Sequence, residues 1–184
     1  MQAEQNTLAQ RLGLTAHNSP LRRKLTGLRE RYPSRTADTL EDWLTDVANA
    51  RGARIVCRPD VSPSDFRAPP LEELTNEELV VAICQPQCLD RPQMLRLAAQ
   101  LVSRGAVRLP LLKLIAERER ATPVLVALAR EALRVDPTHH LWLALADLKT
   151  RQRPVTQSLL HWTRLADPEM ANGRCNAKRW RLVA

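Results

Sequence analysis

The chain has 184 residues, 44% of them hydrophobic, so it is long enough and apolar enough to bury a core, and disorder along its whole length is not expected. Its 28 basic and 20 acidic residues give a formal net charge of +8, which favours an anionic partner such as nucleic acid, an acidic protein or an anionic membrane. Aromatic residues make up 3% of the chain, Leu, Ala and Val predominate among the apolar ones, and thirteen prolines interrupt it. This composition predicts an all-α protein of many short helices.

Apolar runs near the start of the sequence are short. Leu8, Leu12 and Leu14 are interrupted by Gln, Arg and Gly, so no secretory signal is expected. No run reaches the length that crosses a bilayer, and we expect no membrane partner. Four cysteines without a small disulfide-rich framework indicate free thiols in a reducing compartment. The sequence therefore predicts a cytoplasmic protein.

A basic helix is predicted from Ser19 to just before Pro33. Serine is a favoured N-cap, and Pro20 falls at the first helical position, where its missing N–H has no helical partner to lose. Spacings of 4, 3 and 4 place Leu21, Leu25, Leu28 and Tyr32 on one stripe. The stripe should face the core and leave the cations outside, where arginine can bind phosphate bidentately. The candidate nucleic-acid-binding residues on this helix are Arg22, Arg23, Lys24, Arg29 and Arg31.

Two interpretations remain open for this basic segment. The stretch LAQRLGLTAHNSPLRRKL, residues 8–25, resembles a helix-turn-helix unit, with Ala9 and Gly13 four residues apart and a basic helix behind them. The resemblance implies that the second helix enters the major groove of DNA. A plain helical hairpin is the alternative, because seven residues separate Gly13 from Leu21. The cations likewise either bind phosphate or form a solvated face paired with nearby acids.

Further helices are expected on both sides of the basic one. The first covers roughly residues 7–12, and the other starts near Ser34 or Thr36 and ends at Gly52. The apolar face of the latter consists of Leu40, Trp43, Leu44 and Val47. A strand-like run follows at residues 53–57.

Proline content and charge divide the chain into three parts. Residues 1–57 form a basic N-terminal helical segment, residues 58–74 hold four prolines and form a linker, and residues 75–184 form a helical C-terminal domain. An acidic band lies between the two basic parts, and it could neutralise one of them in the fold. The band consists of Glu72, Glu73, Glu77 and Glu78.

The C-terminal domain is predicted as a multi-helix bundle or a short helical-repeat-like domain. Its first helix begins at the capping box Thr75-Asn76-Glu77-Glu78, in which hydroxyl and carboxylate each satisfy the other's backbone N–H. A later helix begins at Thr122-Pro123, which we expect to form its cap. The six helices are expected at about residues 75–84, 90–105, 109–120, 122–136, 138–150 and 155–166. Several are apolar around more than one face, so they are either central in the bundle or covered by another subunit.

One junction in this domain has a familiar pattern. The stretch AREALRVDPTHHLWLALADL, residues 129–148, resembles one inter-helix junction of a tetratricopeptide repeat, with Ala132, Leu133 and Pro137 at its small, apolar and proline positions. No second copy occurs at a fixed period, so we interpret it as a generic helix that ends at Asp-Pro.

The C-terminal stretch GRCNAKRWRLVA repeats the basic pattern. Lys178, Arg179 and Arg181 surround Trp180 and are further candidate nucleic-acid-binding residues. Trp180 either stacks on a base or, as we favour, anchors the segment onto the core.

Patterns of catalysis and metal binding are weak. There is no Gly-rich phosphate loop, no HExxH motif and no nucleophile elbow, so an enzyme is not expected. Cys84 and Cys88 form a single close thiol pair, too few ligands for structural zinc. His139 and His140 lie at a helix start and His161 precedes a tryptophan, which indicates local packing. We expect no metal and no cofactor.

These observations predict a non-enzymatic cytoplasmic binding protein, or a subunit of a larger assembly, that contacts the backbone of DNA or RNA through an Arg-rich helical surface. The alternative is a helical protein–protein interaction module, such as an adaptor, an inhibitor or an antitoxin-like partner, that binds an acidic protein. A homo-oligomer is compatible with both.

Overall fold

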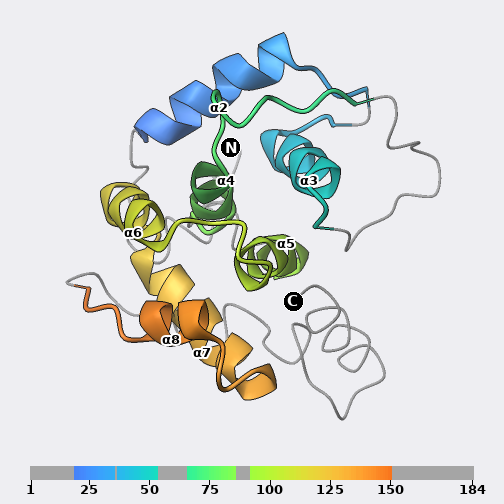
Figure 1. Cartoon of the computed structure of the whole chain (residues 1–184). Helices are drawn as coiled ribbons and strands as arrows, with labels where there is room; N and C mark the ends of the chain where they lie inside the picture. The colour runs from blue at the N-terminus through green and yellow to red at the C-terminus, as the bar shows by residue number, and fades with distance from the viewer. Residues whose placement is uncertain (1–18, 36, 54–65, 86–91, 151–184) are drawn as a thin grey trace, which may run out of the picture.

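The computed structural model describes residues 19–35, 37–53, 66–85 and 92–150. Within these ranges the chain forms seven helices and no strand, which confirms the predicted all-α class (Figure 1). The helices are α2 (Pro20–Arg31), α3 (Leu40–Ala50), α4 (Asn76–Ile83), α5 (Pro92–Ser103), α6 (Leu109–Arg118), α7 (Thr122–Val135) and α8 (His140–Ala146). The helices predicted at 7–12 and 155–166, the strand-like run beyond Ala53, and the cations Lys178, Arg179 and Arg181 lie outside the described residues.

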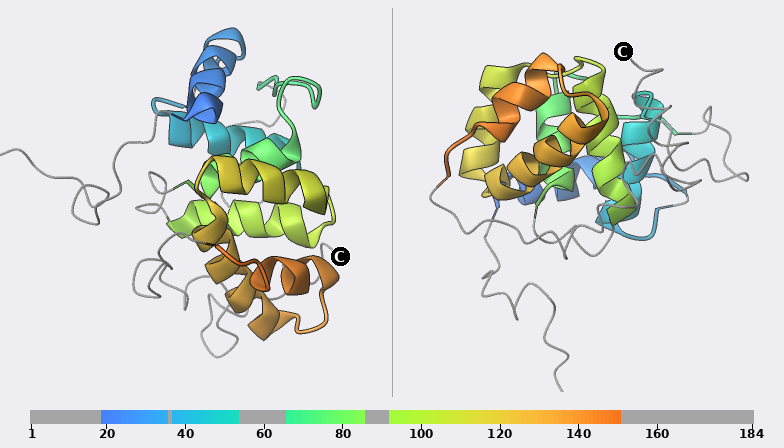
Figure 2. Two further views of the ribbon diagram at one scale, coloured as in Figure 1. Left: turned by 90° about the vertical axis from the view of Figure 1, so that its left-hand side faces the viewer. Right: turned by 90° about the horizontal axis from the view of Figure 1, so that it is seen from below.

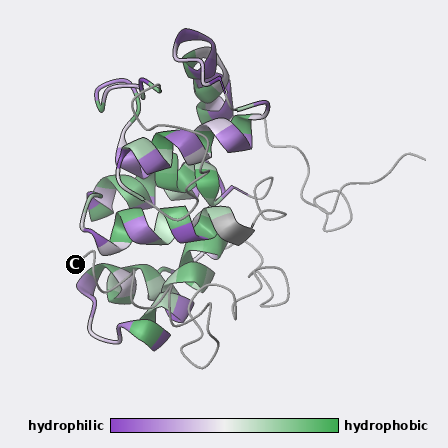
Figure 3. Ribbon diagram, turned by 90° about the vertical axis from the view of Figure 1, so that its right-hand side faces the viewer, coloured by the Kyte–Doolittle hydropathy of each residue, from purple (hydrophilic) through white to green (hydrophobic). Residues whose placement is uncertain are grey.

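The helices form a bundle of three tiers (Figures 1 and 2). Helices α2 and α3 lie at one end, α4, α5 and α6 form the middle, and the α7–α8 hairpin lies at the other end. Helix α4 is central because it contacts α2, α3, α5 and α6. Its last five residues, Leu79 to Ile83, are at most 1% exposed. Figure 3 shows that apolar segments predominate in the middle of this body.

Helix α2 confirms the predicted signals at both ends. The Ser19 hydroxyl accepts a hydrogen bond of 3.0 Å from the backbone N–H of Arg22, and Pro20 is the first helical residue. Leu21, Leu25 and Leu28 are each 1% exposed and form the predicted buried stripe. Tyr32 follows the last turn and is partly buried against the same core.

The start of α3 differs from the prediction. The cap is Thr39, whose hydroxyl accepts from the backbone N–H of Asp42 at 3.1 Å, so the helix begins at Leu40 and not near Ser34 or Thr36. The Ser34 hydroxyl instead donates to Asp46 Oδ2 at 2.6 Å.

The capping box of α4 is present in full, with the Thr75 hydroxyl accepting from the Glu78 N–H and the Glu78 carboxylate accepting from the Thr75 N–H.

The starts of α7 and α8 differ slightly from the prediction. Thr122 is the first residue of α7 and does not cap the helix. Its hydroxyl donates to Glu117 Oε2 at 3.1 Å. Helix α8 starts at His140, two residues later than predicted, because a turn joins the N–H of His139 to the carbonyl of Asp136.

A buried polar cluster anchors the N-terminus of α2 to the ends of α4 and α6. The Ser19 hydroxyl donates to Glu119 Oε2, and the Glu119 carboxylate also accepts from the backbone N–H of Leu21 at 3.4 Å. Gln85 Nε2 donates to Ser19 Oγ at 2.9 Å and to Glu119 at 3.3 Å. The Glu119 side chain is 0% exposed, and Arg118 Nε binds it at 3.0 Å. A carboxylate at a helix N-terminus also interacts favourably with the helix dipole.

Arg51 holds the segment before α4 against the end of α3. Its guanidinium donates to the carbonyl oxygens of Pro69 and Leu74, at 3.1 and 2.5 Å, and to Asn76 Oδ1 at 2.9 Å. Burial lowers the pKa of Arg51 below its usual range, and the nearby carboxylates of Glu77 and Glu78 counteract this in part.

The described helices from both sides of the predicted linker share one hydrophobic core. It contains Leu25 and Trp43 from the N-terminal part together with Leu79, Leu97 and Trp142. The boundaries predicted at 57 and 74 are not tested by this packing. Among the described residues, no helix combines the length and apolar character needed to cross a membrane.

Candidate nucleic-acid interface

The cations of α2 are mostly engaged with neighbouring segments. Arg29 donates to the carbonyl oxygens of Ala37 and Asp38, at 3.1 and 2.6 Å. The Arg23 side chain is exposed and has no hydrogen bond or ion pair with any described residue. Three ion pairs cross from α2 to α3, α4 and the segment before α4: Arg22–Glu41 at 3.5 Å, Lys24–Glu78 at 2.6 Å and Arg31–Glu73 at 2.6 Å.

The acidic band therefore lies against α2, one of the two possibilities that the sequence left open. Glu73 and Glu78 each pair with an α2 cation, whereas Glu77 binds Arg108 on the other side of α4. The paired cations nevertheless remain accessible, with side-chain exposures of 39% for Arg22, 41% for Lys24 and 62% for Arg31. Exposed pairs of this kind contribute about 0–1 kcal/mol each, so they restrain the cations weakly.

A compact group of polar side chains surrounds Glu73 at the C-terminal end of α2. Tyr32 Oη donates to Glu73 Oε1 at 2.5 Å, while Arg31 binds Oε2 of the same carboxylate. The Arg31 guanidinium lies 5.9 Å from the centre of the Tyr32 ring. The hydrogen bond to Glu73 raises the pKa of Tyr32, with burial and the Glu73 charge adding to the effect, whereas the charges of Arg31 and Arg67 lower it. Trp43 Nε1 donates to the Tyr32 carbonyl at 2.8 Å and fixes the backbone at this point.

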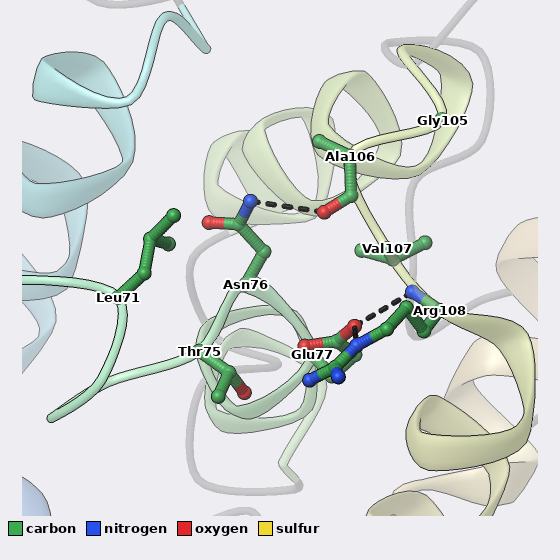
Figure 4. A pocket seen from close by; sticks show the side chains of 8 residues that line it. All are labelled: Leu71, Thr75, Asn76, Glu77, Gly105, Ala106, Val107 and Arg108. Atoms are coloured by element: carbon green, nitrogen blue, oxygen red, sulfur yellow. Dashed lines mark hydrogen bonds and ion pairs between the residues drawn. The ribbon is translucent and has the colours of Figure 1, made fainter.

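A pocket of about 340 Å³ lies between the start of α4 and the α5–α6 connection (Figure 4). Asn76 Nδ2 donates to the carbonyl of Ala106 at 2.9 Å, and Glu77 Oε1 accepts from Arg108 N at 2.6 Å and Nε at 3.2 Å. These polar groups join α4 to the α5–α6 connection and are paired with each other. The lining residues are Leu71, Thr75, Asn76, Glu77, Gly105, Ala106, Val107 and Arg108.

The histidine and cysteine candidates occupy packed positions where they are described. Cys84 is buried at the end of α4 and is not in a disulfide with a described residue, and Cys88 and His161 lie outside the described residues. His139 Nε2 lies 3.1 Å from the carbonyl of Ser103, and its ring stacks on His140 at 5.3 Å. In the described ranges, no three His, Cys, Asp or Glu side chains are grouped so that they could hold a metal ion.

The excess positive charge is unevenly distributed along the chain. The described ranges hold 17 basic and 14 acidic residues, a net charge of +3. Residues 151–184 hold seven basic and two acidic residues, a net charge of +5, and they include Lys178, Arg179 and Arg181. The structure places the α2 cations together but does not test whether the C-terminal cations join them.

Sequence reasoning missed two contributors to this region. Arg67 was counted as part of the linker, and Tyr32 was assigned to the apolar stripe without a role for its hydroxyl. A tyrosine at the end of a basic helix is a signal that its hydroxyl needs a polar partner, but the identity of Glu73 as that partner requires the fold.

The comparisons with known proteins add no assignment. No protein-family model matches the sequence, and no match was found among curated proteins or solved structures.

Proposed function

We propose that this chain is a non-enzymatic, cytoplasmic nucleic-acid-binding protein, acting alone or as a subunit of an assembly, that contacts the phosphate backbone through the exposed cations of α2. The observation that carries the proposal is the set of four cations Arg22, Arg23, Lys24 and Arg31 on one helix, where three stay 39–62% exposed in their ion pairs and Arg23 is exposed without one. The C-terminal cations Lys178, Arg179 and Arg181 are proposed to extend the same surface.

The charge balance sets the expected mode of binding. Carboxylates already pair with three of these cations, Arg22, Lys24 and Arg31. A phosphate that binds any of these three must replace a weak ion pair of about 0–1 kcal/mol. Binding should therefore be modest in affinity and independent of base sequence. Arg29, which donates to two backbone carbonyls, contributes less because those hydrogen bonds hold it against the loop before α3.

The test is fluorescence anisotropy of the full chain with labelled single-stranded and duplex oligonucleotides across a salt series. Four α2 cations on B-DNA predict a slope of log affinity against log salt of about −3.6 from this helix alone. Arg23→Gln should make the slope shallower by about 0.9. Arg130→Gln is the matched control, because Arg130 is an exposed arginine on α7, at the far end of the bundle (Figure 1). Absence of binding to either polymer at low salt would refute the proposal.

A protein-interaction module for an acidic partner is the second candidate, and one feature of α6 favours it. Leu114 is 68% exposed on this helix, with the exposed Pro110 one turn before it and the 54% exposed Arg118 side chain one turn after it. An apolar anchor with a basic flank suits an acidic amphipathic segment. Pull-down from native cells should capture an acidic protein with the full chain and lose it with Leu114→Ser, whereas undiminished capture by the variant would contradict this role.

A further inference from the structure

The carboxylate of Glu73 is held in a manner that resembles the binding of a phosphate group. One oxygen accepts from the Tyr32 hydroxyl at 2.5 Å, and the other receives the Arg31 guanidinium at 2.6 Å. Arg67 lowers the pKa of the same phenol through its charge, and its side chain is exposed. A hydroxyl and a guanidinium directed at one anion can also donate to the oxygens of a phosphodiester.

The backbone that carries both donors is fixed independently of the carboxylate that they bind. The Tyr32 backbone is held by Trp43 Nε1, and the Trp43 side chain is 0% exposed. Arg31 belongs to the last turn of α2, whose apolar stripe is buried. By contrast, Glu73 lies in a turn before α4 and keeps 31% of its side chain exposed. The Glu73 carboxylate is therefore the part of this group that another anion can replace at the lowest cost in free energy.

We propose that Arg31 and Tyr32 form a phosphate subsite for the nucleic-acid backbone, which the Glu73 carboxylate occupies in the free protein and must leave when a phosphodiester binds. The inference rests on the proposed function, since it assigns one further residue, Tyr32, to the same surface. It also assigns a regulatory role to one acid of the acidic band, which competes with nucleic acid for the end of α2.

The first test compares two variants that change the net charge equally. Glu73→Gln removes the competing charge and keeps an oxygen that can accept from Tyr32. Glu72→Gln is the matched control, because Glu72 is the adjacent residue in the same turn, is exposed, and has no ion pair or hydrogen bond with a described residue. With a short single-stranded oligodeoxynucleotide at low salt, Glu73→Gln should bind about fivefold more tightly than the wild type, and Glu72→Gln should change affinity by less than about twofold.

The salt dependence gives a second prediction from the same titrations. If Glu73 leaves when phosphate binds, Arg31 neutralises the same phosphate in the wild type and in Glu73→Gln. The slope of log affinity against log salt should therefore be equal in the two proteins, and Arg31→Gln in the Glu73→Gln background should remove the gain in affinity. Equal gains in Glu73→Gln and Glu72→Gln would mean that net charge alone matters, and the subsite would be rejected while the proposed function stood.

A spectroscopic readout separates this inference from the proposed function. The chain contains a single tyrosine, so tyrosine isotope-labelled at Cζ gives one phenol signal in an NMR spectrum, and that signal reports Tyr32. Inorganic phosphate at constant ionic strength and neutral pH should shift this signal in Glu73→Gln at concentrations at least about fivefold lower than in the wild type or Glu72→Gln. A shift confined to Glu73→Gln, without oligonucleotide binding by any variant, would keep the anion subsite and refute the proposed function. Identical responses in all three proteins would overturn the subsite.

Discussion

Replacing Ser19 by alanine tests the buried polar cluster at the start of α2. The Ser19 hydroxyl accepts from the Arg22 N–H as the helix cap and donates to the buried Glu119 carboxylate. Loss of an N-cap costs about 1 kcal/mol. Loss of a hydrogen bond to a buried charged group costs about a further 1.5–3 kcal/mol. We therefore expect Ser19→Ala to lower the free energy of unfolding by about 2.5–4 kcal/mol.

Thr39 supplies the matched control for this substitution. It caps α3 through the same contact, its hydroxyl accepting from the backbone N–H of Asp42 at 3.1 Å, but it lies at a partly exposed position away from the buried cluster. The Thr39 hydroxyl also donates to Asp42 Oδ2 at 2.6 Å, but this carboxylate is only partly buried. Thr39→Ala should therefore cost about 1–2 kcal/mol, less than Ser19→Ala. Urea unfolding measures both losses, followed by fluorescence of the buried Trp43 and Trp142. Equal losses in the two variants would show that the contact with Glu119 stabilises nothing, and the reasoning would be refuted.

Three further predictions concern single residues. Gly27→Ala should stabilise the protein by about 0.5–1 kcal/mol in urea unfolding, because Gly27 is inside α2 and an added Cβ would meet no atom within 4 Å; destabilisation would contradict the described helix. Burial alone would raise the pKa of Glu77, but hydrogen bonds from the backbone and side chain of Arg108 outweigh it and lower the pKa. The stabilisation from Glu77 is thus complete above the unfolded pKa of about 4.3 and is lost as the pH falls through the lower folded value. Glu77→Gln should cost about 1–1.5 kcal/mol at neutral pH, because the amide oxygen can still accept from Arg108 but only as a neutral group, and the difference from wild type should shrink in acid; a constant difference would contradict the assignment. Glu78→Gln should cost less than about 1 kcal/mol, since Gln preserves the capping box with Thr75 and only the exposed ion pair is lost. Glu78→Ala should cost about 1 kcal/mol more, and equal losses in the two Glu78 variants would show that the box is not stabilising.

Local signals in the sequence predicted the helices well where the signal and its partner lie within four residues. The Ser19 cap, the Thr75 capping box and the spacing of Leu21, Leu25 and Leu28 are of this kind. The predicted start of α3 was wrong because Thr39 caps this helix, whereas the Ser34 hydroxyl donates to Asp46 within α3. Which of several adjacent hydroxyls caps a helix depends on what the others meet in the fold.

The contacts of the candidate site could not be predicted from the sequence in the same way, because they join residues that are far apart along the chain. Lys24 and Glu78 are 54 residues apart, and Ser19 and Glu119 are 100 residues apart. The sequence indicated that the acidic band could meet either basic part, but no spacing rule connects two such segments. It also gave no sign that Glu119 is buried, because a glutamate near the end of a helix is ordinarily solvated.

The hydrogen bonds of Arg51 indicate where the chain can accept an insertion. By holding the carbonyl oxygens of Pro69 and Leu74, Arg51 fixes the two ends of the chain on either side of residues 54–65, whatever that stretch contains. Doubling the length of a segment between two fixed ends costs about 0.6 kcal/mol. A reporter or tag inserted between residues 54 and 65 should therefore be tolerated. A chain cut there would yield two pieces that share a single core, with Trp43 on one and Leu79 on the other, and neither piece would be expected to keep its fold without the other.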